Sequence, residues 1–199
     1  MQATADSKAR AFIGIELPGW LKENIRSSAI KLQDDRFRMV GIDNMHITLF
    51  FLGDIDRRQQ ALVGEVMDRQ GNDAFNISVV GLGTFFARHP DVIFAKIGRG
   101  KEELLGIHRS LSKELKDLGI KVEHKYYVPH ITLAKARGTY SRKDTMDFLE
   151  ESTNTSFGEF MCESITLKQS VLTSASPIYT DIHVKHLKLL RRQLGTGSQ

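Results

Sequence analysis

Apolar residues recur along this chain with two periods, one typical of strands and one typical of helices. Short apolar or alternating runs predict strands, whereas apolar residues spaced three and four apart predict amphipathic helices. The predicted strands cover residues 11–17, 45–52, 75–79, 92–97, 121–126, 127–136, 159–170 and 178–186. The predicted helices cover residues 20–32, 57–69, 102–118 and 141–149. Asp56 is the expected N-cap of the second helix, Gly53 the expected end of the strand before it, and 81–90 a glycine-containing loop.

The order strand, helix, strand, helix, strand occurs roughly twice, which predicts a pseudo-duplicated α+β fold. Two lobes of antiparallel sheet with outer helices would enclose a central cleft, and helix 141–149 would pair with helix 57–69. No linker-like stretch separates the repeats, so we expect one bilobal domain over residues 10–190. Residues 1–9 are expected to form a disordered leader and residues 191–199 a flexible tail.

The tetrapeptide His-Ile-Thr-Leu occurs twice, at residues 46–49 and again at 130–133. Each copy lies in a predicted strand, where successive side chains point to opposite faces. Ile and Leu can therefore enter a core while His and Thr face a groove. By the same alternation, Phe50 shares the face of the first His and Thr. A single His on a strand is usually structural, but two identical tetrapeptides on matching faces favour a shared catalytic site.

Two imidazoles and two hydroxyls around one small site are suited to phosphoryl chemistry. His titrates near 6.5, so one ring can act as a general base while the other acts as a general acid. Thr48 and Thr132 can hydrogen-bond the non-bridging oxygens of a phosphate. This scheme needs no metal and no other cofactor, and the residues themselves do not say which His is the acid.

Composition limits the other interpretations. The 199 residues carry a net charge of +4, a modest excess that permits an anionic ligand such as RNA. No apolar run approaches the roughly 20 residues of a membrane helix, and a single cysteine, Cys162, suits a reducing, cytoplasmic setting. We expect Cys162 to be a buried, inert thiol. His183 and His186 make at most half a metal site, and His108 is interpreted as a core-edge residue on a helical stripe.

With both motifs in view, the chain resembles the two-histidine (2H) phosphoesterase superfamily, and within it the RNA 2′,3′-cyclic phosphodiesterase family, historically called 2′-5′ RNA ligases. The resemblance rests on two His-x-Thr-hydrophobic motifs 84 residues apart and on their flanks. It covers roughly residues 10–187. The matching segments are 11–18 (AFIGIELP), 44–54 (NMHITLFFLGD), 92–95 (VIFA), 127–135 (YVPHITLAK), 164–170 and 177–179.

The resemblance implies a metal-independent hydrolase that opens RNA or nucleotide 2′,3′-cyclic phosphates to 2′-phosphomonoesters, with reversible 2′-5′ ligation as a second direction. It implies that His46 is the proton donor and His130 the proton acceptor. It also places Tyr127 near the substrate base, where stacking and core packing are equally open, and makes Lys135 and Phe50 candidate substrate contacts. Lys125 and Lys135 stand where the family often has Arg, so the bidentate fork is missing there.

Two alternatives stay open at this stage. The His/Thr groove of a non-catalytic nucleotide- or RNA-binding module would recognise phosphate without turning it over. A related 2H enzyme would act on another cyclic phosphate or on a 2′-5′ oligoadenylate. We expect a monomer that binds RNA with 2′,3′-cyclic phosphate ends or cyclic nucleotides, with no membrane and no partner protein implied.

Overall fold

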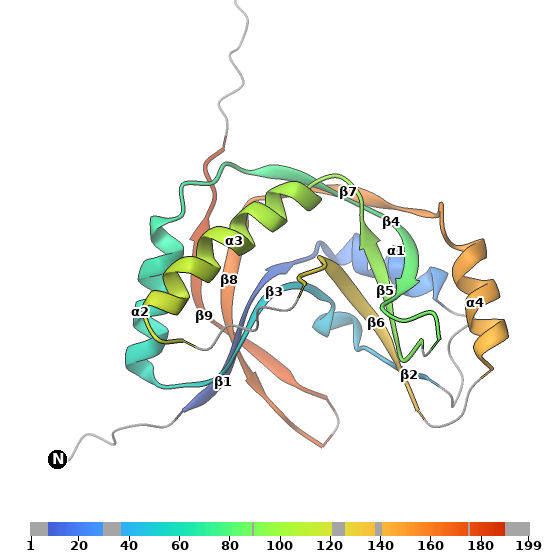
Figure 1. The fold of residues 1–199 in the computed structure, drawn as a ribbon, viewed down its shortest axis with the longest axis horizontal. Helices are drawn as coiled ribbons and strands as arrows, with labels where there is room; N and C mark the ends of the chain where they lie inside the picture. Colours follow the sequence, from blue (N-terminus) through green and yellow to red (C-terminus); the bar gives the residue numbers. More distant parts are fainter. Residues whose placement is uncertain are drawn as a thin grey trace, which may run out of the picture.

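Nine strands form a single antiparallel sheet in the part of the chain that the computed structural model describes, residues 8–29, 37–88, 90–120, 126–137, 141–174 and 176–189. Four α-helices and a short 3-10 helix, η2, accompany it (Figure 1). The strands are β1 (Ala9–Glu16), β2 (Phe37–Met39), β3 (His46–Ile55), β4 (Phe75–Thr84), β5 (Val92–Ile97), β6 (His130–Ala136), β7 (Ser156–Cys162), β8 (Ser164–Val171) and β9 (Ile178–His186). The helices are α1 (Gly19–Ser28), η2 (Ile42–Asn44), α2 (Arg57–Arg69), α3 (Lys101–Asp117) and α4 (Arg142–Glu151).

The sheet consists of two halves that meet at a short seam. One half has the order β3-β1-β8-β9 and the other has β6-β5-β4-β7, with β2 also paired to β6. Where β3 meets β6, the described residues pair at one register position, Ile47 with Ile131. By contrast, β1 and β3 pair along eight positions. The predicted α+β class with antiparallel strands and outer helices is confirmed, and the seam joins the two motif strands directly.

Each half of the sheet is covered by one helix that precedes β5 in the sequence and one that follows it (Figure 1). Helix α1 follows β1 in sequence but packs on β7 of the other half, while α3 follows β5 and packs on β3 and α2. Helix α2 also packs on β9, and α4 packs on β4. The predicted pairing of the fourth helix with the second was therefore wrong, because each of them covers the outer strands of a different half.

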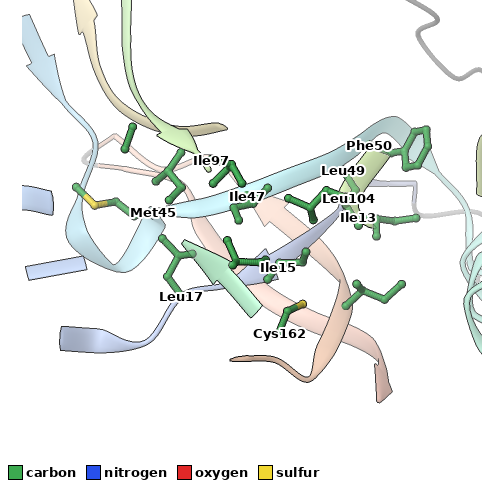
Figure 2. Close-up of a cluster of buried hydrophobic side chains, with 14 of the residues drawn as sticks. Ile13, Ile15, Leu17, Met45, Ile47, Leu49, Phe50, Ile97, Leu104 and Cys162 are labelled. Carbon is green, nitrogen blue, oxygen red and sulfur yellow. The ribbon is translucent and has the colours of Figure 1, made fainter. Parts of the chain in front are cut away.

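The core lies between the sheet and these helices, and both motif isoleucines are part of it. Figure 2 shows Ile47 among its neighbours in this core. Ile13, Ile47 and Ile131 are fully buried, as the strand alternation predicted. Each such side chain contributes roughly 1.5–3 kcal/mol through its removal from water. Cys162 is also buried, as predicted, and burial raises the pKa of its thiol to about 12, which disfavours the reactive thiolate.

The predicted ends of two strands were wrong, because the glycine expected to end each strand lies inside it. Strand β3 continues through Gly53, which adopts a φ of 68°, to Ile55. Strand β4 likewise continues through Gly81 to Thr84, where a loop was expected. Register shifts accommodate the distorted backbone in both strands, as is usual for bulges.

Three further boundaries differ from the sequence predictions. The long strand predicted over 159–170 is two strands that meet at Glu163. Ala9, expected in the leader, begins β1, and residues 127–129 precede β6 instead of belonging to it. Three predictions fall largely outside the described residues: the leader (residues 1–7), the strand predicted over 121–126 (residues 121–125) and the tail (residues 190–199). Helix α2, by contrast, has the predicted bounds, and Asp56 caps it in a capping box.

Candidate active site

The seam brings both His/Thr motifs to one face of the sheet. In an antiparallel pair, the neighbours of two opposed residues oppose each other in reverse order. The isoleucine pairing therefore places His46 across from Thr132 and Thr48 across from His130. Because the isoleucines point into the core, these four side chains point to the other face, where all four are partly exposed. The sequence prediction that the two motifs build one site is consistent with this arrangement.

A β-bulge follows the Thr of each motif. On the first strand, Gly14 pairs with Thr48 and Ile13 with Phe50, so Leu49 is the extra residue. On the second strand the same shift makes Leu133 the extra residue. The two strands consequently share one burial pattern over their first six residues. A bulge reverses the alternation of the residues that follow it, so it decides which later side chains face the site.

The bulge corrects the orientation predicted for Phe50. Phe50 pairs with buried Ile13 and is itself buried in the core, whereas Phe51 pairs with Phe12 and is 65% exposed. Phe51, not Phe50, therefore shares the strand face of the first His and Thr. The equivalent residue of the second strand is Lys135, which is exposed and pairs with Arg38 of β2 and Val92 of β5.

Matching backbone contacts hold the two imidazoles. Nδ1 of His46 lies 2.7 Å from the carbonyl oxygen of Asn44, and Nδ1 of His130 lies 2.7 Å from that of Val128. Since a carbonyl only accepts, each ring donates through Nδ1 and leaves Nε2 for chemistry. At His46 this nitrogen lies 2.9 Å from the hydroxyl of Thr48, which donates to it when the ring is neutral.

Aromatic rings fix the plane of each imidazole. The ring of His46 stacks on Phe12 at 4.6 Å, and Tyr179 meets its edge at 5.3 Å. His130 is flanked in the same way by Phe94 at 5.1 Å and Phe85 at 4.9 Å. This enclosure removes water from both rings. Burial accordingly lowers the pKa of His46 and that of His130 below the ordinary 6.5, while the Nδ1 hydrogen bonds partly offset this.

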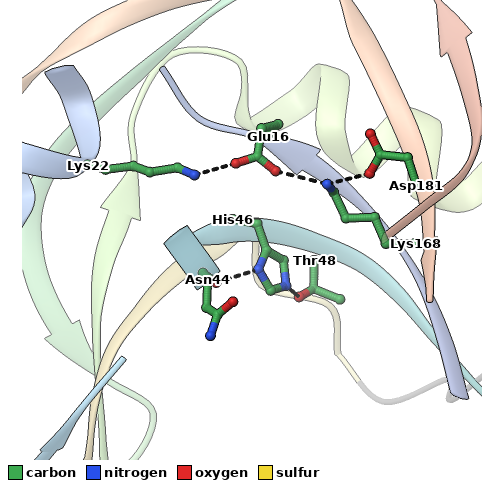
Figure 3. Close-up of polar contacts among 7 residues, drawn as sticks. All are labelled: Glu16, Lys22, Asn44, His46, Thr48, Lys168 and Asp181. Carbon is green, nitrogen blue, oxygen red and sulfur yellow. Dashed lines mark hydrogen bonds and ion pairs between the residues drawn. The ribbon is translucent and has the colours of Figure 1, made fainter. Parts of the chain in front are cut away.

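An ion network lies beside His46 and is absent from the sequence predictions (Figure 3). Glu16, the strand partner of His46, forms ion pairs with Lys22 and Lys168, and Lys168 also contacts Asp181 at 2.6 Å. Although burial alone would lower the pKa of Lys168, its hydrogen bonds to Asp181 and Glu16 raise it. Glu16 in turn raises the pKa of His46, whereas the two lysines lower it.

A pocket of about 230 Å³ opens beside Thr48 and His130 and is mostly aromatic. Three rings form a parallel column in its wall: His108 of α3 lies 4.3 Å from Phe50 and 4.1 Å from Tyr127, with interplanar angles of 6° and 5°. The remaining lining residues are Leu49, Phe51, Phe85, Tyr126 and Val128. Tyr127 thus stacks on His108 and packs against the core, whereas its stacking on a substrate base stays a prediction.

Sequence reasoning missed His108, because its helical stripe marked it only as a core-edge residue. No local pattern reveals that its ring would lie between a β3 residue and a residue of the 126–129 segment. Of the other candidates, His183 contacts Asp68 at 2.9 Å, and Lys125 lies outside the described residues. Within the described ranges, no three His, Cys, Asp or Glu side chains group as a metal site. No helix in those ranges is long and apolar enough to cross a membrane.

Comparison with known proteins yields a consistent set of relatives. The RNA 2′,3′-cyclic phosphodiesterase of Methanothermobacter thermautotrophicus is 31% identical over 187 residues, which cover 90% of this chain and 100% of the relative. The protein of the same name from Methanocaldococcus jannaschii is 32% identical over 177 residues, covering 85% and 96%.

Solved structures share the fold at lower identity. Escherichia coli LigT complexed with 3′-AMP superposes with a TM-score of 0.76 at 20% identity, covering 91% of this chain and 99% of LigT. TT0787 of Thermus thermophilus gives 0.73 at 23% identity, covering 90% and 98%. The family model of the 2′-5′ RNA ligase superfamily matches residues 26–171, which include both His/Thr motifs and the seam between them. The chain therefore belongs to the 2′-5′ RNA ligase superfamily.

Proposed function

We propose that this protein hydrolyses 2′,3′-cyclic phosphates at RNA or nucleotide ends, and that His46 and His130 are its acid and base. The observation that carries the proposal is the seam, where one isoleucine pairing sets two His/Thr pairs on the same face. The names of the two archaeal relatives supply the substrate class. Two hydroxyls and two imidazoles at opposed positions of neighbouring strands suit a reaction at a single phosphorus atom.

The reaction needs one proton taken and one given. His130, neutral, accepts a proton from water through Nε2, and the resulting hydroxide attacks phosphorus. The bond from phosphorus to the 3′ oxygen breaks, and His46, protonated, donates the proton that this oxygen requires. The product is a 2′-phosphomonoester, and the two rings have exchanged protonation states, which solvent resets. Thr48 and Thr132 donate hydrogen bonds to the non-bridging oxygens, where negative charge accumulates.

The assignment of His46 as the acid comes from the family resemblance, and the charges beside the two rings differ. Glu16 lies beside His46 and favours its protonated form, although Lys22 and Lys168 oppose this. Among the described residues, no such carboxylate contributes at His130. A bound phosphate adds negative charge next to both rings, which stabilises an imidazolium in the complex. Run in reverse with a 5′ hydroxyl in the place of water, the same pair would join two RNA ends.

The direct test uses an RNA oligonucleotide ending in a 2′,3′-cyclic phosphate, incubated in excess EDTA with the wild type, His46→Gln and His130→Gln. Gln preserves polarity and size but cannot exchange a proton near neutral pH. Phosphorus NMR locates the product phosphate. We expect a 2′-phosphate from the wild type, and rates lower by about 10²–10⁴-fold in each variant.

Each possible result has a distinct meaning. Variants that fold normally and retain wild-type rates would contradict the assigned site. Binding of the cyclic end without turnover would instead favour a recognition module. A 3′-phosphate product would mean that the 2′ oxygen, not the 3′ oxygen, is the leaving group. Loss of turnover in EDTA would show that a metal takes part.

A further inference from the structure

The two motif histidines have strand partners of opposite charge. Glu16 of β1 is paired with His46, and Lys96 of β5 is paired with His130. Directly opposed residues of an antiparallel pair point to the same face, with Cβ atoms about 4.5–5.5 Å apart. Each charged side chain therefore starts beside one imidazole, on the site face. The backbones of the two halves are equivalent at this position, but the charges are not.

The charge of Lys96 is directed away from His130. Its stem passes over Gly81 and Gly83 of β4: a Cβ at Gly81 would lie 2.8 Å from Cε of Lys96, and one at Gly83 would lie 3.4 Å from Cδ. Because β5 lies between β4 and β6, a stem that crosses β4 leads away from His130. Burial lowers the pKa of His130 and the hydrogen bond to Val128 raises it, and among the described residues no charged group contributes.

Glu16, by contrast, is held beside its histidine (Figure 3). Its carboxylate forms ion pairs with Lys22 of α1 and with Lys168 of β8, the latter at 3.1 Å. The side chains of the two lysines are only 11% and 10% exposed, so their packing restrains the carboxylate between them. Lys168 is fixed in turn by Asp181 of β9 at 2.6 Å.

Glu16 acts on the imidazole through space. Nδ1 of His46 meets the carbonyl oxygen of Asn44 and Nε2 meets the hydroxyl of Thr48. A carboxylate that accepted a hydrogen bond from Nε2 would compete with the leaving oxygen for the same proton. The ion pairs to the two lysines therefore keep Glu16 near the ring and leave Nε2 for the substrate.

The charges that face His46 belong to one network of zero net charge. Lys22 and Lys168 offset Glu16 and Asp181, while Asp43 of η2 and the phenol of Tyr179 line the groove next to them. Burial lowers the pKa of His46, the Asn44 hydrogen bond and Glu16 raise it, and Lys168 and Lys22 lower it. Removing one charge from the network should therefore move this pKa in a direction set by the sign of that charge.

From this arrangement, and resting on the proposed function, we propose that Glu16 is a positioning residue of the reaction: its carboxylate, held by Lys22 and Lys168, makes His46 and not His130 the proton donor. The carboxylate favours the imidazolium of His46, and the equivalent position beside His130 offers no such partner. One charged residue on β1 thus gives a direction to a site whose two halves otherwise match.

The pH profile of kcat/KM separates the donor from the acceptor. Above both pKa values, the reactive form is limited by how tightly the donor holds its proton. Below both pKa values, it is limited by how readily the acceptor loses one. A change confined to the pKa of His46 therefore alters kcat/KM on the alkaline side if His46 is the donor, and on the acidic side if it is the acceptor.

The test measures this profile with an RNA oligonucleotide ending in a 2′,3′-cyclic phosphate, for wild type, Glu16→Gln and Lys22→Met. Glu16→Gln should lower kcat/KM on the alkaline side and leave the acidic side unchanged. Lys22→Met keeps an apolar stem but removes the charge, so it should raise kcat/KM on the alkaline side. Each pH unit by which that limb moves changes the alkaline-side value about tenfold. Glu16→Asp keeps the carboxylate and should recover part of the loss.

Glu159→Gln is the matched control, because it removes one carboxylate from an ion pair with Arg99 on β7, at the far edge of the sheet. It should change neither side of the profile. Equal losses on both sides in Glu16→Gln and Lys22→Met would show a structural role and overturn the proposal. Changes confined to the acidic side would make His46 the acceptor and overturn it as well.

A second measurement keeps this inference separate from the proposed function. If wild type does not turn over the cyclic end, the hydrolysis proposal fails, and NMR titration of the His46 ring tests the network alone. A pKa of His46 that falls in Glu16→Gln and rises in Lys22→Met would support the action of the network on His46, and an unchanged pKa would overturn it. If circular dichroism shows that Glu16→Gln does not fold, the direction of the change in Lys22→Met decides.

Discussion

The Thr48 hydroxyl lies 2.9 Å from Nε2 of His46, the nitrogen that delivers the proton to the leaving oxygen in the proposed mechanism. The same hydroxyl can turn to a phosphate oxygen once substrate binds. Thr48→Val removes the hydroxyl at nearly constant volume and should lower kcat by about 10²–10³-fold, as when other oxyanion donors are removed. Thr48→Ser keeps the hydroxyl and should retain most activity. Steady-state kinetics of both variants checks this, and equal losses would mean that the hydroxyl alone does not account for the effect.

Gly14 leaves the space that positions His46. A Cβ at Gly14 would lie 2.9 Å from the carbonyl oxygen of Ile47 and 3.4 Å from Cδ2 of His46. Gly14→Ala should therefore displace β3, reduce stability by roughly 1–3 kcal/mol and lower kcat. Gly106→Ala in α3 meets nothing within 4 Å and should be stabilising by about 0.5–1 kcal/mol. Urea unfolding of the two variants gives the comparison, and a Gly14 variant as stable and active as wild type would refute the predicted crowding.

In the proposed mechanism, the lowered pKa values of His46 and His130 determine the pH dependence of turnover. The reactive form has one ring protonated and one neutral, so it is most populated between the two lowered pKa values. The optimum of kcat/KM, which reports the free enzyme, should lie below about pH 6.5. The optimum of kcat should lie higher, because bound phosphate raises the pKa of both rings. Profiles of the two parameters from about pH 4.5 to 9 that coincide would contradict this account.

The same lowered pKa values should appear in the pH dependence of stability. Below about pH 6.5 the unfolded chain takes up protons at these two histidines while the folded chain does not, until its lower pKa values are reached. The free energy of unfolding should therefore fall as the pH drops through that window. The double variant His46→Gln/His130→Gln should lose less stability there than wild type. Parallel curves for wild type and the double variant would show that neither ring is held neutral by the fold.

Local signals predicted part of this fold well. The bounds of α2, β5 and β9 agree with the sequence predictions to the residue. In α2 the reason is a capping box at Asp56 followed by an amphipathic stripe, because both signals come from residues close together in the sequence. The pairing of His and Thr on one face also follows from two-residue alternation, which needs no knowledge of the neighbouring strand.

What the sequence did not predict depends on partners far away in the chain. The bulge that turns Phe51 instead of Phe50 to the face of His46 arises from the register of β3 against β1. Alternation within one strand carries no information about that register. The ring column of His108 joins α3, β3 and the segment before β6. Arg38 lies on a strand of three residues, which is too short for any period to be visible, and its pairing with Lys135 is not a local signal.

The exchange of helices between the two halves has a consequence for how the molecule comes apart. A chain cut between β5 and α3 would leave the N-terminal fragment without the helix that covers β3, and the C-terminal fragment without the helix that covers β7. Neither fragment could bury its own sheet, so the two should acquire structure only when they complement each other. The intact chain should accordingly melt in one cooperative transition, and the seam between β3 and β6 should persist until the whole domain unfolds.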